Sequence, residues 1–204
     1  MLASPTMTTE TRETGIEAQS QKMPGIARAW DPRVWGTFVA AAGGTVFVLT
    51  NRGELADPWP PVALAAWGLV FVAHLWATLL MPRHFPRSGP ISRSAPLVYC
   101  VSVIAMIAVI QLGRVALEQI NRVDLHQALT VFAVGAHFFP FAKVFSNPFF
   151  TRLAWVMSTL GVLATIVGLA WSGTASAAVV VVNGLVMLAL LTHYAMAMRE
   201  PESS

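Results

Sequence analysis

Leu153 to Trp171 reads LAWVMSTLGVLATIVGLAW, and Ala177 to Met198 reads AAVVVVNGLVMLALLTHYAMAM. Neither stretch contains Asp, Glu, Lys or Arg. A helix needs about 20 apolar residues to cross a hydrocarbon core of about 30 Å. A helix also satisfies its backbone hydrogen bonds within a single crossing, where no water is present. The two stretches therefore predict two transmembrane helices joined by a short connection.

The rest of the chain has the same character. Of its 204 residues, 55% are hydrophobic and 11% are charged, whereas soluble domains carry about 25% charged residues. Six apolar windows are long enough to cross a bilayer: Val34–Thr50, Pro61–Met81, Ala95–Gly113, Leu125–Phe145, Leu153–Trp171 and Ala177–Met198. We therefore predict an all-α fold, a polytopic membrane helix bundle with about six transmembrane helices over residues 34–198.

Both ends of the chain are polar. Residues 1–33 are rich in Thr, Ser, Glu, Gln and Gly and show no apolar periodicity, so we expect a disordered cytoplasmic tail. Residues 199–204 are expected to form a second short cytoplasmic tail. No secretory signal peptide is expected, because residues 5–10 read PTMTTE where its apolar region would begin.

The orientation follows from the thirteen Lys and Arg residues, because positive flanking segments stay on the cytoplasmic side. With the N-terminus inside, only Arg52, Arg114 and Arg122 lie in outer loops, and the other ten lie on the inner side. Both termini are thus predicted to be cytoplasmic. The pI of about 9.6 fits attraction to an anionic inner leaflet. The predicted partner is the lipid bilayer, and no nucleic-acid partner is predicted.

Cysteine content limits the chemistry. Cys100 is the one cysteine of the chain, which excludes an internal disulfide, a Cys-x-x-Cys redox pair and a thiolate zinc site. Neither a phosphate-binding Gly-x-x-x-x-Gly-Lys loop nor a Gly-x-Ser-x-Gly elbow occurs. No enzymatic activity and no metal site are predicted from these motifs.

Small residues recur at helical spacing in two windows. They are Gly36, Ala40 and Gly44 in the first window, and Ala154, Ser158, Gly161, Thr165 and Gly168 in the fifth. Such rows let two helix backbones approach closely in a membrane. They could form a contact between two copies of the chain or with another membrane protein. We favour packing within one subunit, because six helices must pack against one another in any case.

Histidines are the notable polar residues of the predicted spans. His74, His137 and His193 each lie in a helix that descends from outside to inside. His74 and His137 are both expected near ~18 Å from the outer surface, and His193 about a turn deeper. Polar groups at such depth are costly without a partner or water, so they are candidates for function.

The fourth window carries a polar row, in which His126, Thr130 and His137 share one helix face. This face is expected to point into the bundle, towards the other histidines or Asn183 of the sixth window. Pro140 removes a backbone donor three residues after His137, and Gly135 softens the preceding turn. A helix kink at Gly135 and Pro140 is therefore predicted beside the imidazole.

Residues 135–150 read GAHFFPFAKVFSNPFF. This segment resembles a Gly-x-His-Phe-x-Pro-x-Ala-x-x-Phe-x-x-Pro-x-aromatic pattern of small, uncharacterised, multi-pass bacterial membrane proteins. The resemblance covers sixteen residues and implies a bacterial cytoplasmic membrane. It also implies that His137 and Pro140 lie at the centre of a family signature, and it supplies no activity.

Three function classes remain open. The chain could be a small transporter or channel in which His74 and His137 line a polar path, since imidazoles titrate near neutrality. It could bind haem or a metal if those two imidazoles converged as axial ligands, although no cofactor is predicted. We favour the third class, a non-catalytic membrane bundle or interaction subunit whose histidines hydrogen-bond between helices.

Overall fold

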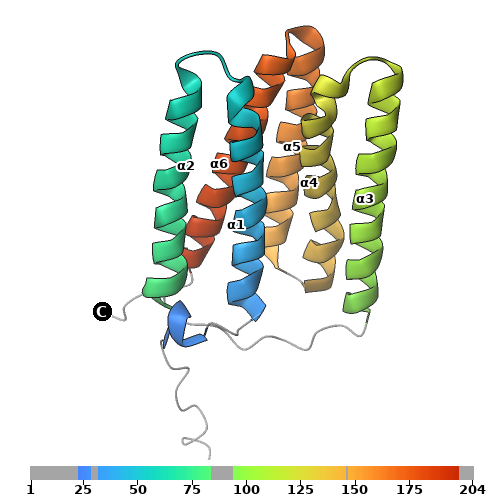
Figure 1. The fold of residues 1–204 in the computed structure, drawn as a ribbon. Helices are drawn as coiled ribbons and strands as arrows, with labels where there is room; N and C mark the ends of the chain where they lie inside the picture. The colour runs from blue at the N-terminus through green and yellow to red at the C-terminus, as the bar shows by residue number, and fades with distance from the viewer. Residues whose placement is uncertain (1–22, 29–31, 84–93, 146, 198–204) are drawn as a thin grey trace, which may run out of the picture.

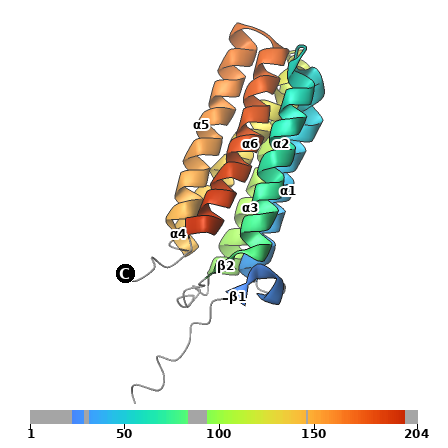
Figure 2. The same cartoon turned by 90° about the vertical axis from the view of Figure 1, so that its left-hand side faces the viewer.

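The computed structural model describes residues 23–28, 32–83, 94–145 and 147–197. The long helices of these residues run side by side along one axis (Figures 1 and 2). They are α1 (Pro32–Asn51), α2 (Trp59–Leu75), α3 (Ala95–Gln119), α4 (His126–Phe145), α5 (Pro148–Ala170) and α6 (Gly173–Ala197). Within the described residues, six helices are long and apolar enough to cross a membrane, given their length and composition. The predicted all-α polytopic bundle is confirmed.

The helix ends extend past the apolar windows where local hydrogen bonds allow it. α3 continues from Gly113 to Gln119, and an ion pair of 2.9 Å joins Arg114 to Glu118 across one helical turn. α5 begins at Pro148, because the side chain of Asn147 accepts a hydrogen bond of 3.0 Å from the backbone N–H of Phe149. Hydrophobicity thus predicts where the spans lie. Helix caps and ion pairs on the helix surface influence where the helices begin and end.

One part of the N-terminal segment has regular structure, in contrast to the disorder expected for residues 1–33. Strand β1 (Met23–Pro24) pairs antiparallel with β2 (Pro82–Arg83), and the 3-10 helix η2 (Gly25–Arg28) follows β1. The pairing satisfies backbone N–H and C=O groups of the two strands. Amino-acid composition alone does not predict such a pairing. The remaining tail predictions, for residues 1–22 and 199–204, lie outside the described residues.

The helices are unequally buried. α6 packs against α1, α2 and α5, and α5 packs in turn against α4. Half of the apolar membrane-spanning window of α6 is buried inside the bundle. In α3, only 11% of the corresponding window is buried. α3 lies at the edge of the bundle against α4 (Figure 1). α6 is therefore the central helix and α3 the peripheral one.

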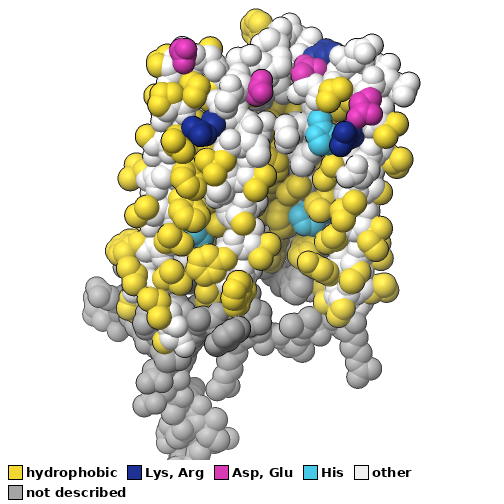
Figure 3. Space-filling view, in the orientation of Figure 1, with side chains coloured by type: hydrophobic (Ala, Val, Ile, Leu, Met, Phe, Trp, Pro, Cys, Tyr) yellow, Lys and Arg dark blue, Asp and Glu magenta, His cyan; other side chains and the backbone are white. Residues whose placement is uncertain are grey.

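The two ends of the bundle differ. The beginning of α1 and the end of α6 lie at the same end, which we call the terminal face (Figure 1). Figure 3 shows acidic and basic side chains gathered at the opposite end, the far face, above a broad apolar band. This distribution is the one a bilayer imposes on a spanning bundle.

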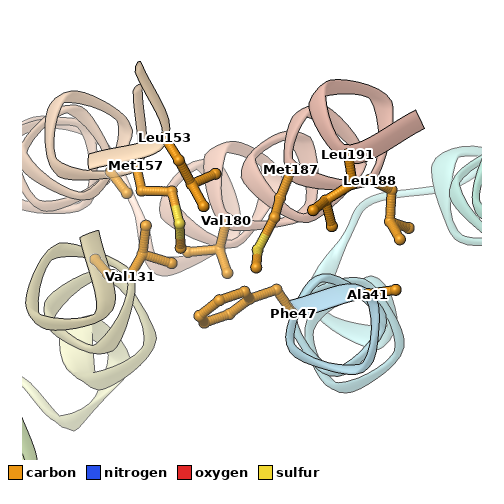
Figure 4. Close-up of a cluster of buried hydrophobic side chains, with 11 residues drawn as sticks. Ala41, Phe47, Val131, Leu153, Met157, Val180, Met187, Leu188 and Leu191 are labelled. Carbon is orange, nitrogen blue, oxygen red and sulfur yellow. The ribbon is translucent and has the colours of Figure 1, made fainter. Parts of the chain in front are cut away.

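An apolar core joins four helices near the middle of the bundle. Phe47 of α1, Val131 of α4, Met157 of α5, and Val180 and Met187 of α6 form one buried cluster (Figure 4). Lipid is as apolar as these side chains, so close packing rather than water exclusion has to hold the helices together.

An arginine ties the connections together at the far face. Arg122 precedes the 3-10 helix η5 (Val123–Leu125) and donates from Nη2 to the carbonyl of Gly168, at 2.6 Å, near the end of α5. It also donates to both carboxylate oxygens of Asp124, at 3.1 Å each. That hydrogen-bonded carboxylate raises the pKa of the Arg122 guanidinium. A cation at a helix C-terminus is favourable, so this contact joins η5 to α5.

Candidate functional site

The small residues of α5 face α4. A Cβ atom added to Gly135 would lie 2.5 Å from the backbone N of Ser158, and one added to Gly161 would lie 2.5 Å from the backbone N of Phe132. Gly168 lies instead against the side chains of Leu125 in η5 and Ser176 in α6. The backbones of α4 and α5 therefore touch along this row, as small residues permit in membranes.

The other members of the α5 row have different surroundings. Ala154 and Ser158 are buried. Thr165 is half-buried, and its hydroxyl donates a hydrogen bond of 2.9 Å to the carbonyl of Gly161. It also borders an open surface pocket, together with apolar side chains of α4 and α5. This row thus serves packing within the chain over most of its length.

The row on α1 behaves differently along its length. Gly44 lies against Gly184 of α6, since a Cβ added to Gly184 would lie 2.6 Å from the carbonyl oxygen of Gly44. Ala40 packs against the central core. A Cβ at Gly36 would meet no atom within 4 Å. The α1–α6 contact is thus tight at Gly44 and absent at Gly36. Gly184, which lies opposite Gly44, was not among the residues predicted from the sequence.

His74 is fully buried near the terminal end of α2. Its ring meets Phe38 of α1 edge-on, with 6.4 Å between ring centroids, and its Nε2 lies 3.5 Å from the hydroxyl of Thr78. Thr78 is also fully buried and belongs to the π-helical turn η4 (Trp76–Leu80) that continues α2. π-Helical turns often mark functional positions. Thr78 was missed, although its place four residues after His74 puts both on one helix face.

His137 lies on α4 in an aromatic environment and is partly buried. Its Nδ1 is hydrogen-bonded to the backbone carbonyl of Val134, one turn earlier. Its ring centroid lies 4.1 Å from that of Phe138 and 5.4 Å from that of Phe141. Phe141 in turn meets Tyr99 of α3 at 5.3 Å. His137 therefore belongs to the side of α4 on which α3 packs.

Asn183 is fully buried on α6, between the core residues Val180 and Met187. Neither Oδ1 nor Nδ2 of its amide has a hydrogen-bond partner among the described residues. Such a buried, unpaired amide costs about 1 to 3 kcal/mol. Among the described residues, it is the buried side chain with two such unpaired atoms.

The remaining sequence-predicted residues do not join these three. His193 is exposed on the outer surface of α6. The hydroxyl of Thr130 donates a hydrogen bond of 2.9 Å to the carbonyl of His126, so it is satisfied within α4. His126 is half-buried and its Nε2 has no partner among the described residues. Pro140 lies inside α4, which continues to Phe145, and the kink predicted there stays a prediction.

Close contacts between antiparallel helices show the relative depth of the polar residues. His137 lies level with Ala40 of α1, and His74 lies level with Phe38, so the two imidazoles differ by about 3 Å in depth at the helical rise. Asn183 lies nearer the far face by the same measure, by about 8 Å relative to His137 and about 10 Å relative to His74. The contacts used are Phe38 with His74, Gly44 with Gly184, Gly168 with Ser176, and Gly135 with Ser158.

These residues do not converge, although two share a depth. Among the described residues, no hydrogen bond or ring contact links His74, His137 and Asn183 to one another. His74 lies between α1 and α2, His137 lies towards α3, and Asn183 lies in the central core. Likewise, no group of three or more His, Cys, Asp or Glu side chains that could hold a metal ion occurs in the described part of the chain.

Comparison with known proteins adds no relative. No protein-family model, no curated protein and no solved structure matches the chain. The resemblance of residues 135–150 therefore rests on that segment's own sequence pattern, and function has to be argued from the structure.

Proposed function

We propose that this chain is a non-catalytic membrane subunit that binds another membrane protein through α3. The observation that carries the proposal is the placement of α3. This helix of 25 residues packs against α4, and only Ala95 and Ser102 are buried along it. A span that contributes so little to the core of its own subunit is available to pack against a helix of a partner.

The outer face of α3 has a regular apolar surface. Leu97, Val101, Ile104 and Leu112 recur at helical spacing and are 56 to 70% exposed. Helix pairs in membranes associate through van der Waals packing along such a face. Lipid also covers exposed apolar faces. A partner bound to α3 would therefore be detected as a difference in cross-linking between this face and another exposed face of the bundle.

Photo-crosslinking in the native membrane provides that measurement. A benzophenone amino acid at Ile104 is expected to give one discrete protein adduct, whose mass identifies either another protein or a second copy of the chain. The matched control is the same label at Leu69 of α2, which is 74% exposed against 66% for Ile104. Adducts of equal yield and pattern from both positions, or lipid adducts alone, would refute the proposal.

The proposal includes a bacterial cytoplasmic membrane, with the terminal face in the cytoplasm. Ten of the thirteen Lys and Arg residues support this orientation by the positive-inside rule. With an even number of spans, both termini then lie on the cytoplasmic side.

A further inference from the structure

The imidazole of His137 has a defined orientation. A backbone carbonyl can only accept a hydrogen bond, so Nδ1 carries the proton and donates it to Val134. In the neutral ring, Nε2 then presents its lone pair. Nε2 has no hydrogen-bond partner among the described residues, and it is not one of the buried unpaired atoms. His137 therefore offers an accessible acceptor inside the apolar band.

Aromatic rings lie beside this imidazole. Phe138 and Phe141, which follow His137 in α4, have ring centroids 4.1 and 5.4 Å from that of the imidazole. Tyr99 of α3 extends the group through its edge contact with Phe141, and Phe150 of α5 stacks on Phe138 at 6.1 Å with an angle of 13° between the rings. A planar apolar molecule beside Nε2 would thus meet several ring faces and edges.

The side of α4 between α1 and α3 is open. Figure 3 shows the surface hollowed between these two helices, with a histidine side chain inside the hollow. In the same orientation, α4 lies between α1 and α3 (Figure 1), and α4 carries His126 and His137. The hollow is therefore reached sideways, from the depth of the lipid tails.

We propose that this hollow binds a hydroxylated aromatic lipid of the hydroquinone type. A hydroxyl group of the ligand donates a hydrogen bond to Nε2 of His137, and the ring packs against Phe138, Phe141 and Tyr99. The ligand has to be a donor because Nε2 is an acceptor. It has to be apolar because it enters from the bilayer. A few polar groups in an apolar, aromatic pocket are typical of small-molecule sites. This inference is independent of the partner proposed for α3.

The test uses the full-length protein in phosphatidylcholine nanodiscs and ¹⁵N-labelled histidine. The probe is 2-decyl-1,4-hydroquinone, and the control ligand is its dimethyl ether, which has the same ring and chain but no hydroxyl donor. We expect the hydroquinone to move the Nε2 resonance of His137 and to bind at least tenfold more tightly than the ether. The oxidised quinone, which also lacks a donor, is expected to bind as weakly as the ether.

Variants give a second measurement. His137→Phe keeps a ring and removes the acceptor, so hydroquinone binding should fall at least tenfold. His193→Phe, at an exposed histidine of α6, should leave binding unchanged. Equal affinity for hydroquinone and ether in the wild-type protein would overturn the proposal, whatever the folding of the variants. A Soret absorbance in the purified protein that disappears in His137→Phe would also overturn it, because the site would then hold haem.

Discussion

Replacing Gly184 by alanine tests the close contact between α1 and α6. The added Cβ would lie 2.6 Å from the carbonyl oxygen of Gly44, 2.8 Å from Cγ2 of Val48 and 3.1 Å from Cβ of Phe47. Ordinary contact begins at 3.4 Å, so α1 and α6 would have to separate by about 0.8 Å. The nearest atom belongs to the backbone and has no alternative rotamer. The variant can therefore be accommodated only by moving a helix.

The expected cost follows from that movement. A radial gap of 0.5 to 1 Å removes about a quarter to a half of the dispersion energy of the contacts that it opens. Overpacking of this kind costs about 1 to 3 kcal/mol, and the better helix propensity of alanine returns at most about 1 kcal/mol. We therefore expect Gly184→Ala to lower the free energy of unfolding by about 1 kcal/mol. The α1–α6 contact should be weakened most.

The assay is reversible unfolding in bicelles, followed by tryptophan fluorescence. Gly68→Ala is the matched control, because Gly68 lies within α2 and a Cβ there would meet nothing within 4 Å. It should leave stability unchanged or raise it by up to about 1 kcal/mol. If both variants shifted stability equally, or if Gly184→Ala were the more stable, the tight α1–α6 packing would be refuted.

Two further predictions concern the buried amide and the orientation. Asn183→Leu keeps the number and branching of heavy atoms and should raise stability by about 1 to 2 kcal/mol, because it removes an unpaired buried amide. Thr192→Val is the control in the same unfolding assay, since its hydroxyl donates 2.8 Å to the carbonyl of Leu188 and its loss should bring no gain. A destabilised Asn183→Leu would show that the amide has a partner, such as a buried water. For the orientation, fusion at the C-terminus should make green fluorescent protein fluoresce and leave alkaline phosphatase inactive, while phosphatase inserted after Asp57 should be active, and the opposite pattern would contradict it.

The sequence predicts which residues of a helix pack closely, but it does not predict which helix they pack against. The helix packing of Ala154, Ser158, Gly161 and Gly168 follows from their spacing, because small residues repeated every three or four positions lie on one helix face. The identity of the facing helix does not follow, since α4, α6 or a second copy would satisfy the same pattern. Gly184 was missed because its partner, Gly44, lies 140 positions earlier in the chain.

The candidate site shows the same division. Sequence placed His74 and His137 at matching depth, because depth depends only on the number of residues from the helix end. The sequence also suggested that the histidines face one another. Residue spacing shows which side chains share a helix face, but it does not show which neighbouring helix that face contacts. The structure puts His74 between α1 and α2 and His137 towards α3. The hydrogen bond that orients the His137 ring was likewise invisible to spacing arguments.

The number of spans and their approximate limits depend on the sequence alone, because the match between apolar length and bilayer thickness is a property of each segment by itself. The central place of α6, the peripheral place of α3 and the hollow beside His137 were decided by tertiary structure. They depend on which small residues allow two backbones to touch, as Gly44 and Gly184 do. In a lipid environment, where apolar surfaces gain little from leaving the solvent, such close contacts select the arrangement of the bundle.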